Sequence, residues 1–245
     1  MQSATQTSGR CRNQRVTPCA AFTRIEAFFT LLGLALLLTT ALPLLGNSKL
    51  RSDRLICGNN LRRIGVAFHV WSDSHEDKIP WLVPVANGGT AESTLMNNAW
   101  FNYLAVSNEL GNPALLGCPS DNVKLATRWD LGDGGFSNPG YRNNSLSYLV
   151  GCHGDMTLPF SVLSADRNII PDNVNAGCSI GFRTVIQIAP RSGTVTGWVS
   201  TNVHWGTGNL LLTGGNVVET GTAQLRKVLS GANPDNGSEH YLLPR

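Results

Sequence analysis

The chain has 245 residues, of which 14% are charged, and its formal net charge is +3. This length suits one sizeable domain, and the small charge without a basic tract excludes a typical nucleic-acid-binding surface. The 26 glycines and the low charge favour a loop-rich fold with β structure over a helical bundle.

The first 21 residues carry positive charge and no acidic residue. Arg10, Arg12 and Arg15 are the basic residues of this segment. Because Lys and Arg are enriched on the cytoplasmic side of membrane helices, residues 1–21 are predicted to form a cytoplasmic leader peptide.

The following segment is long and apolar, since residues 27–46 contain no charge. About 20 helical residues span about 30 Å, which is the thickness of a bilayer core, and a soluble core helix would show a polar stripe. A cleavable secretory signal would be shorter and would end in a small-x-small site, but Asn-Ser-Lys-Leu-Arg follows here. We predict one transmembrane helix over 22–46 and an extracytoplasmic domain over 47–245.

Two charged residues, Arg24 and Glu26, lie at the start of this stretch. A carboxylate at a membrane boundary costs free energy unless it is paired, so Glu26 is a candidate functional residue. Residues 21–26, Ala-Phe-Thr-Arg-Ile-Glu, resemble the prepilin cleavage motif Gly-Phe-Thr-Leu-Ile-Glu of type IV pilins and type II secretion pseudopilins.

The resemblance implies how the chain is processed and assembled. In that family a prepilin peptidase/methyltransferase cuts before the Phe and methylates the new amine, which here implies cleavage between Ala21 and Phe22. It also implies that Glu26 neutralises the amino terminus of a neighbouring pilin-like subunit, because two opposite charges buried together cost less than either alone. Two positions depart from the motif: Ala21 replaces Gly, and Arg24 replaces an apolar residue and would need an anionic partner in a fibre.

Residues 50–72 are predicted to continue the same helix. An apolar stripe at spacings of three and four is typical of an amphipathic helix that packs on a sheet, and it consists of Leu61, Ile64, Phe68 and Trp71. Arginines flank the stripe and are expected on the wet face: Arg51, Arg54, Arg62 and Arg63. The helix is expected to end near Ser72-Asp73, before the Lys-Ile-Pro break.

Four cysteines lie in the body of the chain, namely Cys57, Cys118, Cys152 and Cys178. Four cysteines allow three disulfide connectivities, and free buried thiols are the alternative. The segment that begins Cys-Gly-Asn-Asn-Leu-Arg-Arg-Ile-Gly and the later Cys-Pro-Ser-Asp resemble segments of prepilin-type N-terminal cleavage/methylation domain proteins. The resemblance implies a Cys57–Cys118 disulfide, which leaves Cys152 with Cys178.

The remainder predicts short elements between long loops, which favours the α+β fold class. The resemblance implies that this fold is pilin-like, with the amphipathic half of the long N-terminal helix packed on a small antiparallel sheet. We expect helices at 98–104 and 221–230, a strand at 147–151 and a loop over 128–144. Residues 208–213 and 216–219 predict a hairpin closed by the two-residue turn Gly214-Gly215.

Few residues suggest a chemical site. Asp166 and Arg167, in a segment that also resembles the family, are expected to fix loops by hydrogen bonds, and His204 matches a family histidine whose later Asp is replaced here by Gly214. Asp130 and Asp133 are the best oxygen ligands for calcium but lack the density of an EF-hand loop. No zinc-protease, phosphate-loop or nucleophile-elbow motif is present in the sequence, so no enzyme activity and no other metal or cofactor is predicted.

The sequence therefore predicts a structural pseudopilin of a type II secretion or type IV pilus-like system, in the bacterial inner membrane with its N-terminus in the cytoplasm. The alternative is a pilin-anchored module that binds a ligand such as a polysaccharide. Tryptophans could supply its stacking platform, and the candidates are Trp81, Trp100, Trp129, Trp198 and Trp205. Partners are the prepilin peptidase, other pilin-like subunits and the inner membrane, with no nucleic acid.

Overall fold

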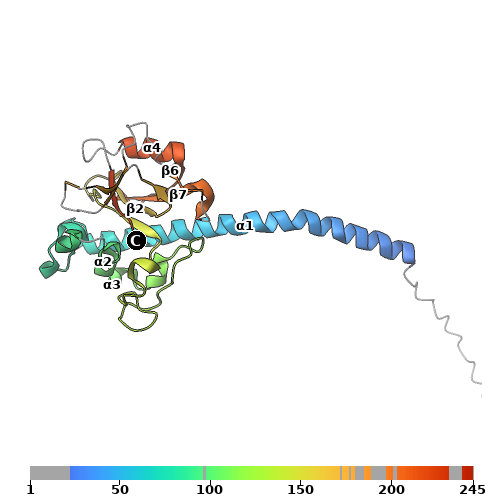
Figure 1. Ribbon diagram of the computed structural model, residues 1–245, viewed down its shortest axis with the longest axis horizontal. Helices are drawn as coiled ribbons and strands as arrows, with labels where there is room; N and C mark the ends of the chain where they lie inside the picture. The colour runs from blue at the N-terminus through green and yellow to red at the C-terminus, as the bar shows by residue number, and fades with distance from the viewer. Residues whose placement is uncertain are drawn as a thin grey trace, which may run out of the picture. The chain divides into compact units, whose positions relative to one another are not determined.

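Figure 1 shows the computed structural model of the chain. The structure describes residues 23–95, 98–171, 173–176, 178–179, 185–188, 197–200, 203–231 and 239–244, with side chains left aside at 41–47, 94–95, 173–176, 185–188, 231 and 239. The leader, with the predicted processing residues Ala21 and Phe22, lies outside the described residues. The chain divides into two compact units, Met1–Gly46 and Asn47–Arg245.

The longest element is α1, a helix over Arg24–Asp73, which ends where the sequence placed its end. Its first turn is closed by a capping box. Glu26 Oε2 accepts hydrogen bonds from the backbone N and the hydroxyl of Thr23, each at 2.9 Å, and Thr23 Oγ1 accepts from the backbone N of Glu26 at 3.3 Å. Thr23 and Glu26 thus satisfy N–H groups that the start of a helix leaves without partners.

The first part of α1 runs to residue 46 and the second part begins at residue 47, where the chain divides into its two units. The first part exposes apolar side chains in every direction around its axis. Each of the following is at least 47% exposed: Ile25, Phe28, Phe29, Leu31, Leu32, Leu34, Leu36, Leu37 and Leu38. Among the residues that the structure describes, no helix combines the length and the apolarity needed to cross a membrane.

The second unit is built on a seven-stranded antiparallel sheet, which makes the fold α+β, as predicted, but with a larger sheet than expected. The strand order is β4-β5-β9-β1-β2-β7-β8. The strands are β1 (Tyr148–Gly151), β2 (Val162–Asp166), β4 (Asn173–Ala176), β5 (Val185–Ile188), β7 (Thr207–Leu212), β8 (Val217–Gly221) and β9 (Glu239–Leu242). A separate pair joins β3 (Ile169–Ile170) to β6 (Gly197–Trp198).

Side chains alternate between two cores on opposite faces of this sheet, as the period of two in a strand requires. On one face Tyr148 and Val150 of β1 pack with the predicted stripe of α1, whose four residues are at most 4% exposed. On the other face Leu149 packs with Leu225 and Leu229 of α4 (Thr222–Gly231). Figure 1 shows α4 and the second part of α1 on opposite sides of the strands.

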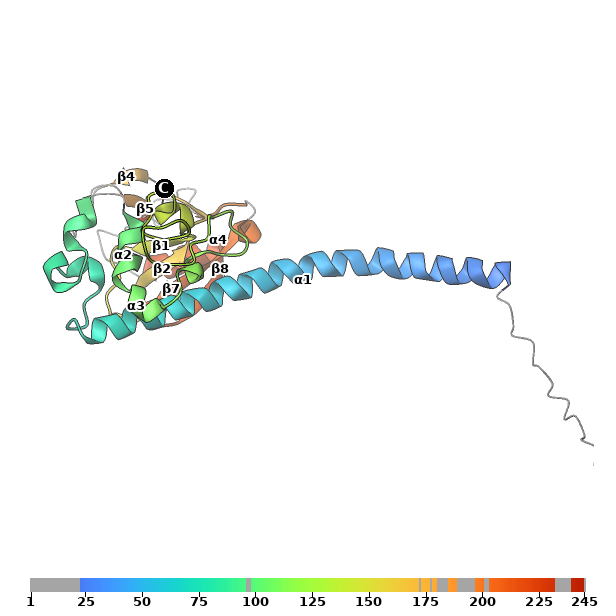
Figure 2. The ribbon, with the colours of Figure 1, turned by 90° about the horizontal axis from the view of Figure 1, so that it is seen from below.

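The remaining helices are short. The predicted helices at 98–104 and 221–230 correspond to α2 (Ala99–Ala105) and α4, and α3 (Ser107–Leu110) follows α2. Phe68 of α1 and Tyr103 of α2 have ring centroids 5.8 Å apart, so α2 packs beside α1 (Figure 2). In the described residues, 3-10 turns occupy the loops at η1 (Pro80–Leu82), η2 (Val85–Asn87), η3 (Ala91–Leu95), η4 (Pro113–Leu116), η5 (Arg142–Ser145) and η6 (His204–Gly206).

The predicted hairpin is present as β7 and β8, but the two-residue turn was wrong. Leu212 N donates to Asn216 O and Gly215 N donates to Leu212 O, both at 2.9 Å, so the loop has three residues. Gly215 adopts φ 82°, the left-handed conformation that closes such a loop. A Cβ at Gly214 would lie 2.9 Å from the carbonyl oxygen of Pro159, so a side chain at this position would need the neighbouring loop to move.

Candidate functional site

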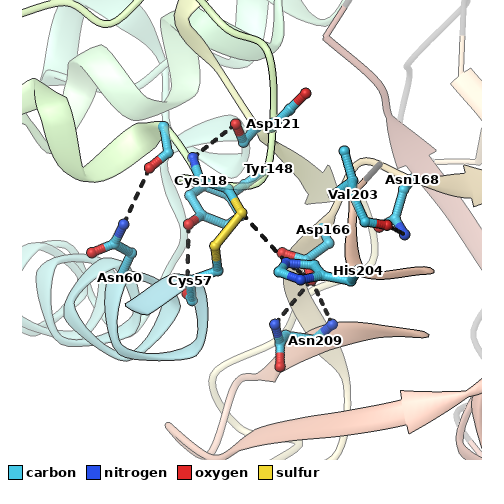
Figure 3. Close-up of a disulfide and its surroundings, with 12 residues drawn as sticks. Cys57, Asn60, Cys118, Asp121, Tyr148, Asp166, Asn168, Val203, His204 and Asn209 are labelled. Carbon is cyan, nitrogen blue, oxygen red and sulfur yellow. Dashed lines mark hydrogen bonds and ion pairs between the residues drawn. A yellow bond between two sulfur atoms is a disulfide. The ribbon is translucent and has the colours of Figure 1, made fainter. Parts of the chain in front are cut away.

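A disulfide joins α1 to the loop before β1. It links Cys57 to Cys118, the pair that the resemblance implied, and both residues are buried. Figure 3 shows this disulfide bond between Cys57 of the helix and Cys118 of the loop. Nearby, Asn60 Nδ2 donates to the carbonyl oxygen of Gly117 at 3.2 Å. The second part of α1 is therefore attached to the domain covalently as well as by packing.

His204 lies against this disulfide and against a buried carboxylate. Its Nε2 is 3.4 Å from Sγ of Cys118 and 3.4 Å from Oδ2 of Asp166 at the end of β2. Asp166 Oδ2 also accepts from the backbone N of Asn209 at 2.7 Å and from its Nδ2 at 3.0 Å. The cluster thus joins α1, β2, β7 and η6 in the interior (Figure 3).

Burial sets the protonation of this pair. It raises the pKa of Asp166 to about 7, although the two hydrogen bonds from Asn209 act in the opposite sense. Burial, followed by the positive charge of Arg54, lowers the pKa of His204. The raised pKa of Asp166 and the lowered pKa of His204 both favour a protonated carboxyl beside a neutral imidazole. Within the described part of the chain Asp166 Oδ1 and His204 Nδ1 have no hydrogen-bond partner, which is less costly for neutral groups than for charged ones.

The backbone at His204 adopts an uncommon conformation. His204, Trp205 and Gly206 have φ values of 57°, 49° and 80°, and a non-glycine residue in this region costs roughly 1–3 kcal/mol. The carbonyl oxygen of His204 accepts from Arg54 Nη2 at 3.0 Å and from Thr207 Oγ1 at 2.8 Å. These contacts hold the turn in place, and they explain why Arg54 is partly buried and not on the wet face predicted for it.

An ion pair between Arg167 and Asp121 supports the same region. Arg167 Nε lies 2.7 Å from Asp121 Oδ2, and its Nη2 donates to Asp121 Oδ1 at 2.9 Å. This bidentate geometry is the strong form of an Arg–carboxylate contact. Arg167 therefore fixes a loop by hydrogen bonds, as predicted, whereas Asp166 accepts its hydrogen bonds from Asn209 of strand β7. Both partners lie more than 40 residues away in the sequence.

The two weak calcium candidates, Asp130 and Asp133, contact other side chains of the protein. Asp130 Oδ2 lies 3.5 Å from Arg128 Nε, and Asp133 Oδ1 accepts from Tyr141 OH at 3.2 Å. The loop over 128–144 is shaped by these contacts. Whether it binds calcium stays a prediction.

The tryptophans do not form the platform that a polysaccharide-binding module would use. Trp81 and Trp198 are buried, and Trp100 and Trp129 are partly buried against the core. Trp205, at 57% exposure, is the exposed one of these five.

The predicted Cys152–Cys178 disulfide was wrong, since the structure does not join these two residues. The physical reason is that Cys178 faces a histidine: its Sγ lies 3.3 Å from His153 Nε2. His153 Nε2 is in turn 2.9 Å from His240 Nδ1. This cluster could not be predicted from the sequence, because its members are far apart in the chain. The capping role of Thr23 was not predicted either, although the Thr-x-x-Glu spacing indicates it.

The junction at His204 has the character of an internal cross-link and not of a reaction centre. His204 and Asp166 are 2% and 1% exposed, so a substrate could not touch either of them in this conformation. No family model, no curated protein and no solved structure matches the chain.

Proposed function

We propose that this chain is a structural pilin-like subunit, a pseudopilin of a type II secretion or type IV pilus-like system, processed before Phe22. The observation that carries the proposal is the contrast along α1. Its first part exposes apolar side chains all round, whereas its second part is embedded in an α+β domain and attached there by a disulfide. An apolar surface of this kind needs cover, which the inner membrane provides before assembly and the same helix of other copies provides afterwards.

The start of α1 supports an assembly role for Glu26. Cleavage before Phe22 would place a new amine one residue from Thr23, at the end of the helix where Glu26 lies. Both hydrogen bonds that Glu26 accepts from Thr23 use Oε2, so the capping box fixes the carboxylate while leaving Oε1 for a neighbouring amine. Such a pair would remove two isolated charges from an apolar fibre core.

The disulfide and the buried junction suit a subunit under mechanical load. Force applied to α1 in a fibre passes to the sheet through the second part of the helix. The disulfide of Cys57 connects that part to the loop before β1, and the stripe residues connect it to the core. Arg54 forms an ion pair with Glu219 of β8. The domain would then follow the helix without sliding along it.

Site-specific photo-cross-linking tests the proposal in membranes. A photoreactive phenylalanine analogue is placed at Phe29, which is 64% exposed on α1, and as a matched control at Leu131, which is 69% exposed on the domain. We expect adducts between copies from Phe29 when a prepilin peptidase and its assembly machine are present, and none from Leu131. Adducts from Phe29 to lipid alone under those conditions would contradict assembly.

A further inference from the structure

The cluster of His153, Cys178 and His240 lies apart from the His204 junction and has no role in the proposed assembly. His153 Nε2 is 2.9 Å from His240 Nδ1 and 3.3 Å from Cys178 Sγ. One ligand atom from each residue lies within 4.8 Å of the other two. His240 is buried, and His153 and Cys178 are partly buried.

Strand pairing explains how three distant residues meet. In the β1–β9 ladder Gly151 is opposite Tyr241, and the backbone N of Cys152 donates to the carbonyl oxygen of His240 at 3.0 Å. His153, the next residue, is therefore beside His240. Strand β5 pairs with the other edge of β9, and Cys178 lies in the connection between β4 and β5. The cluster is thus a consequence of inserting the C-terminal strand between β5 and β1.

We propose that His153, Cys178 and His240 bind a thiophilic divalent transition-metal ion, with Zn²⁺ as the first candidate. Two imidazole nitrogens and one thiolate are ligands that Zn²⁺ prefers, and three protein ligands leave a fourth position for water or another donor. With Zn–N of about 2.0–2.1 Å and Zn–S of about 2.3 Å, neighbouring ligand atoms in a tetrahedral site lie about 3.3–3.6 Å apart. The two short separations here need to open by only a few tenths of an ångström, and the third, between Cys178 and His240, is at most 4.8 Å and has to reach the same range.

The charge balance also suits a divalent ion. The thiol proton of Cys178 leaves to solvent on binding, so one thiolate and two neutral imidazoles leave a net charge of +1 on the site. Such an ion would tie the β4–β5 connection to β1 and β9 at one point. It would also hold Cys178 as a ligand, which prevents its oxidation to a disulfide in an extracytoplasmic compartment.

Cobalt and zinc titration of the full chain tests the site. The untagged protein is purified in detergent and treated with a mild reductant, and mass spectrometry verifies that the Cys57–Cys118 disulfide remains. Co²⁺ is added and the thiolate-to-cobalt charge-transfer absorption is recorded, followed by displacement with Zn²⁺. We expect the band in the wild type, with one equivalent of Zn²⁺ removing it.

Variants decide which residues bind the ion. Cys178→Ser should abolish the charge-transfer band, and His240→Gln should weaken Zn²⁺ binding by more than about 100-fold, because loss of a ligand exceeds the 10- to 100-fold cost of altering its hydrogen-bond partner. His153→Gln repeats the test at a less buried position if His240→Gln fails to fold. His69→Gln on α1 and Cys152→Ser are matched controls and should bind as the wild type does. Absence of the band in the wild type, or an unchanged band in Cys178→Ser, would overturn the proposal.

Discussion

Asp166 offers a quantitative test of the buried junction, through the variant Asp166→Asn. Asparagine keeps an oxygen that can accept the two hydrogen bonds from Asn209, but it cannot ionise. In the wild type, burial raises the pKa of Asp166 from 3.8 to about 7. The folded chain therefore retains a proton at pH values where the unfolded chain has released it. The raised pKa of Asp166 therefore adds to the free energy of unfolding. This contribution is fully present below pH 3.8 and is lost as the pH rises through about 7.

The magnitude follows from these two values. One unit of pKa difference corresponds to about 1.4 kcal/mol, and between pH 5 and pH 8 the wild type should lose roughly 2–3 kcal/mol of unfolding free energy relative to Asp166→Asn. His204 acts in the opposite sense, because its lowered pKa makes stability fall as the pH drops below 6.5. That contribution is present in both proteins and cancels to first order in their difference.

Urea denaturation in detergent, followed by tryptophan fluorescence at pH 5 and pH 8, measures this difference. Trp71 and Trp81 are in the core and report on unfolding of the domain. Asp73→Asn, at an exposed position at the end of α1, controls for loss of a carboxylate in general. A wild-type–variant difference that is the same at both pH values would refute the argument that burial controls the protonation of Asp166.

Three further predictions concern the disulfide, the sheet and the start of α1. The double variant Cys57→Ala/Cys118→Ala opens a connection with a sequence separation of 61 and should lose about 4 kcal/mol of unfolding free energy, measured by urea denaturation; a loss below about 1 kcal/mol would show that packing alone holds α1. Gly151→Ala would place a Cβ 2.0 Å from the carbonyl oxygen of Val162 and should cost about 3 kcal/mol or more, whereas Gly221→Ala, with no atom within 4 Å, should change stability by less than about 0.5 kcal/mol. Glu26→Gln keeps the capping box but removes the charge, so the amount of protein in the membrane should not change and the cross-links from position 29 should disappear. Unchanged cross-links would mean that the charge has no part in assembly.

The helices and the hairpin could be predicted because their signals are local. The spacing of Leu61, Ile64 and Phe68 marks one helix face, and these residues are fully buried. The glycines between two apolar runs indicated the β7–β8 hairpin, although not the length of its loop, because Gly215 alone takes the left-handed conformation there. The Cys57–Cys118 pairing came from resemblance and not from spacing, since several connectivities were open.

The rest depends on long-range pairing that no local pattern encodes. Strand β9 inserts between β5 and β1, and only this insertion brings His240 beside His153. The contact of His204 with Asp166 likewise requires β2 and β7 to be neighbours. Burial of Arg54 was missed because its partner, the carbonyl oxygen of His204, belongs to a turn 150 residues later.

The intact mass of the membrane-extracted chain, expressed with and without a prepilin peptidase, tests the central claim most directly. The proposed pilin-like role predicts a peptidase-dependent product that begins at Phe22, with one added methyl group on its amine. A chain that keeps its leader in both cases would contradict processing before Phe22, and with it the assembly of this chain as a pseudopilin.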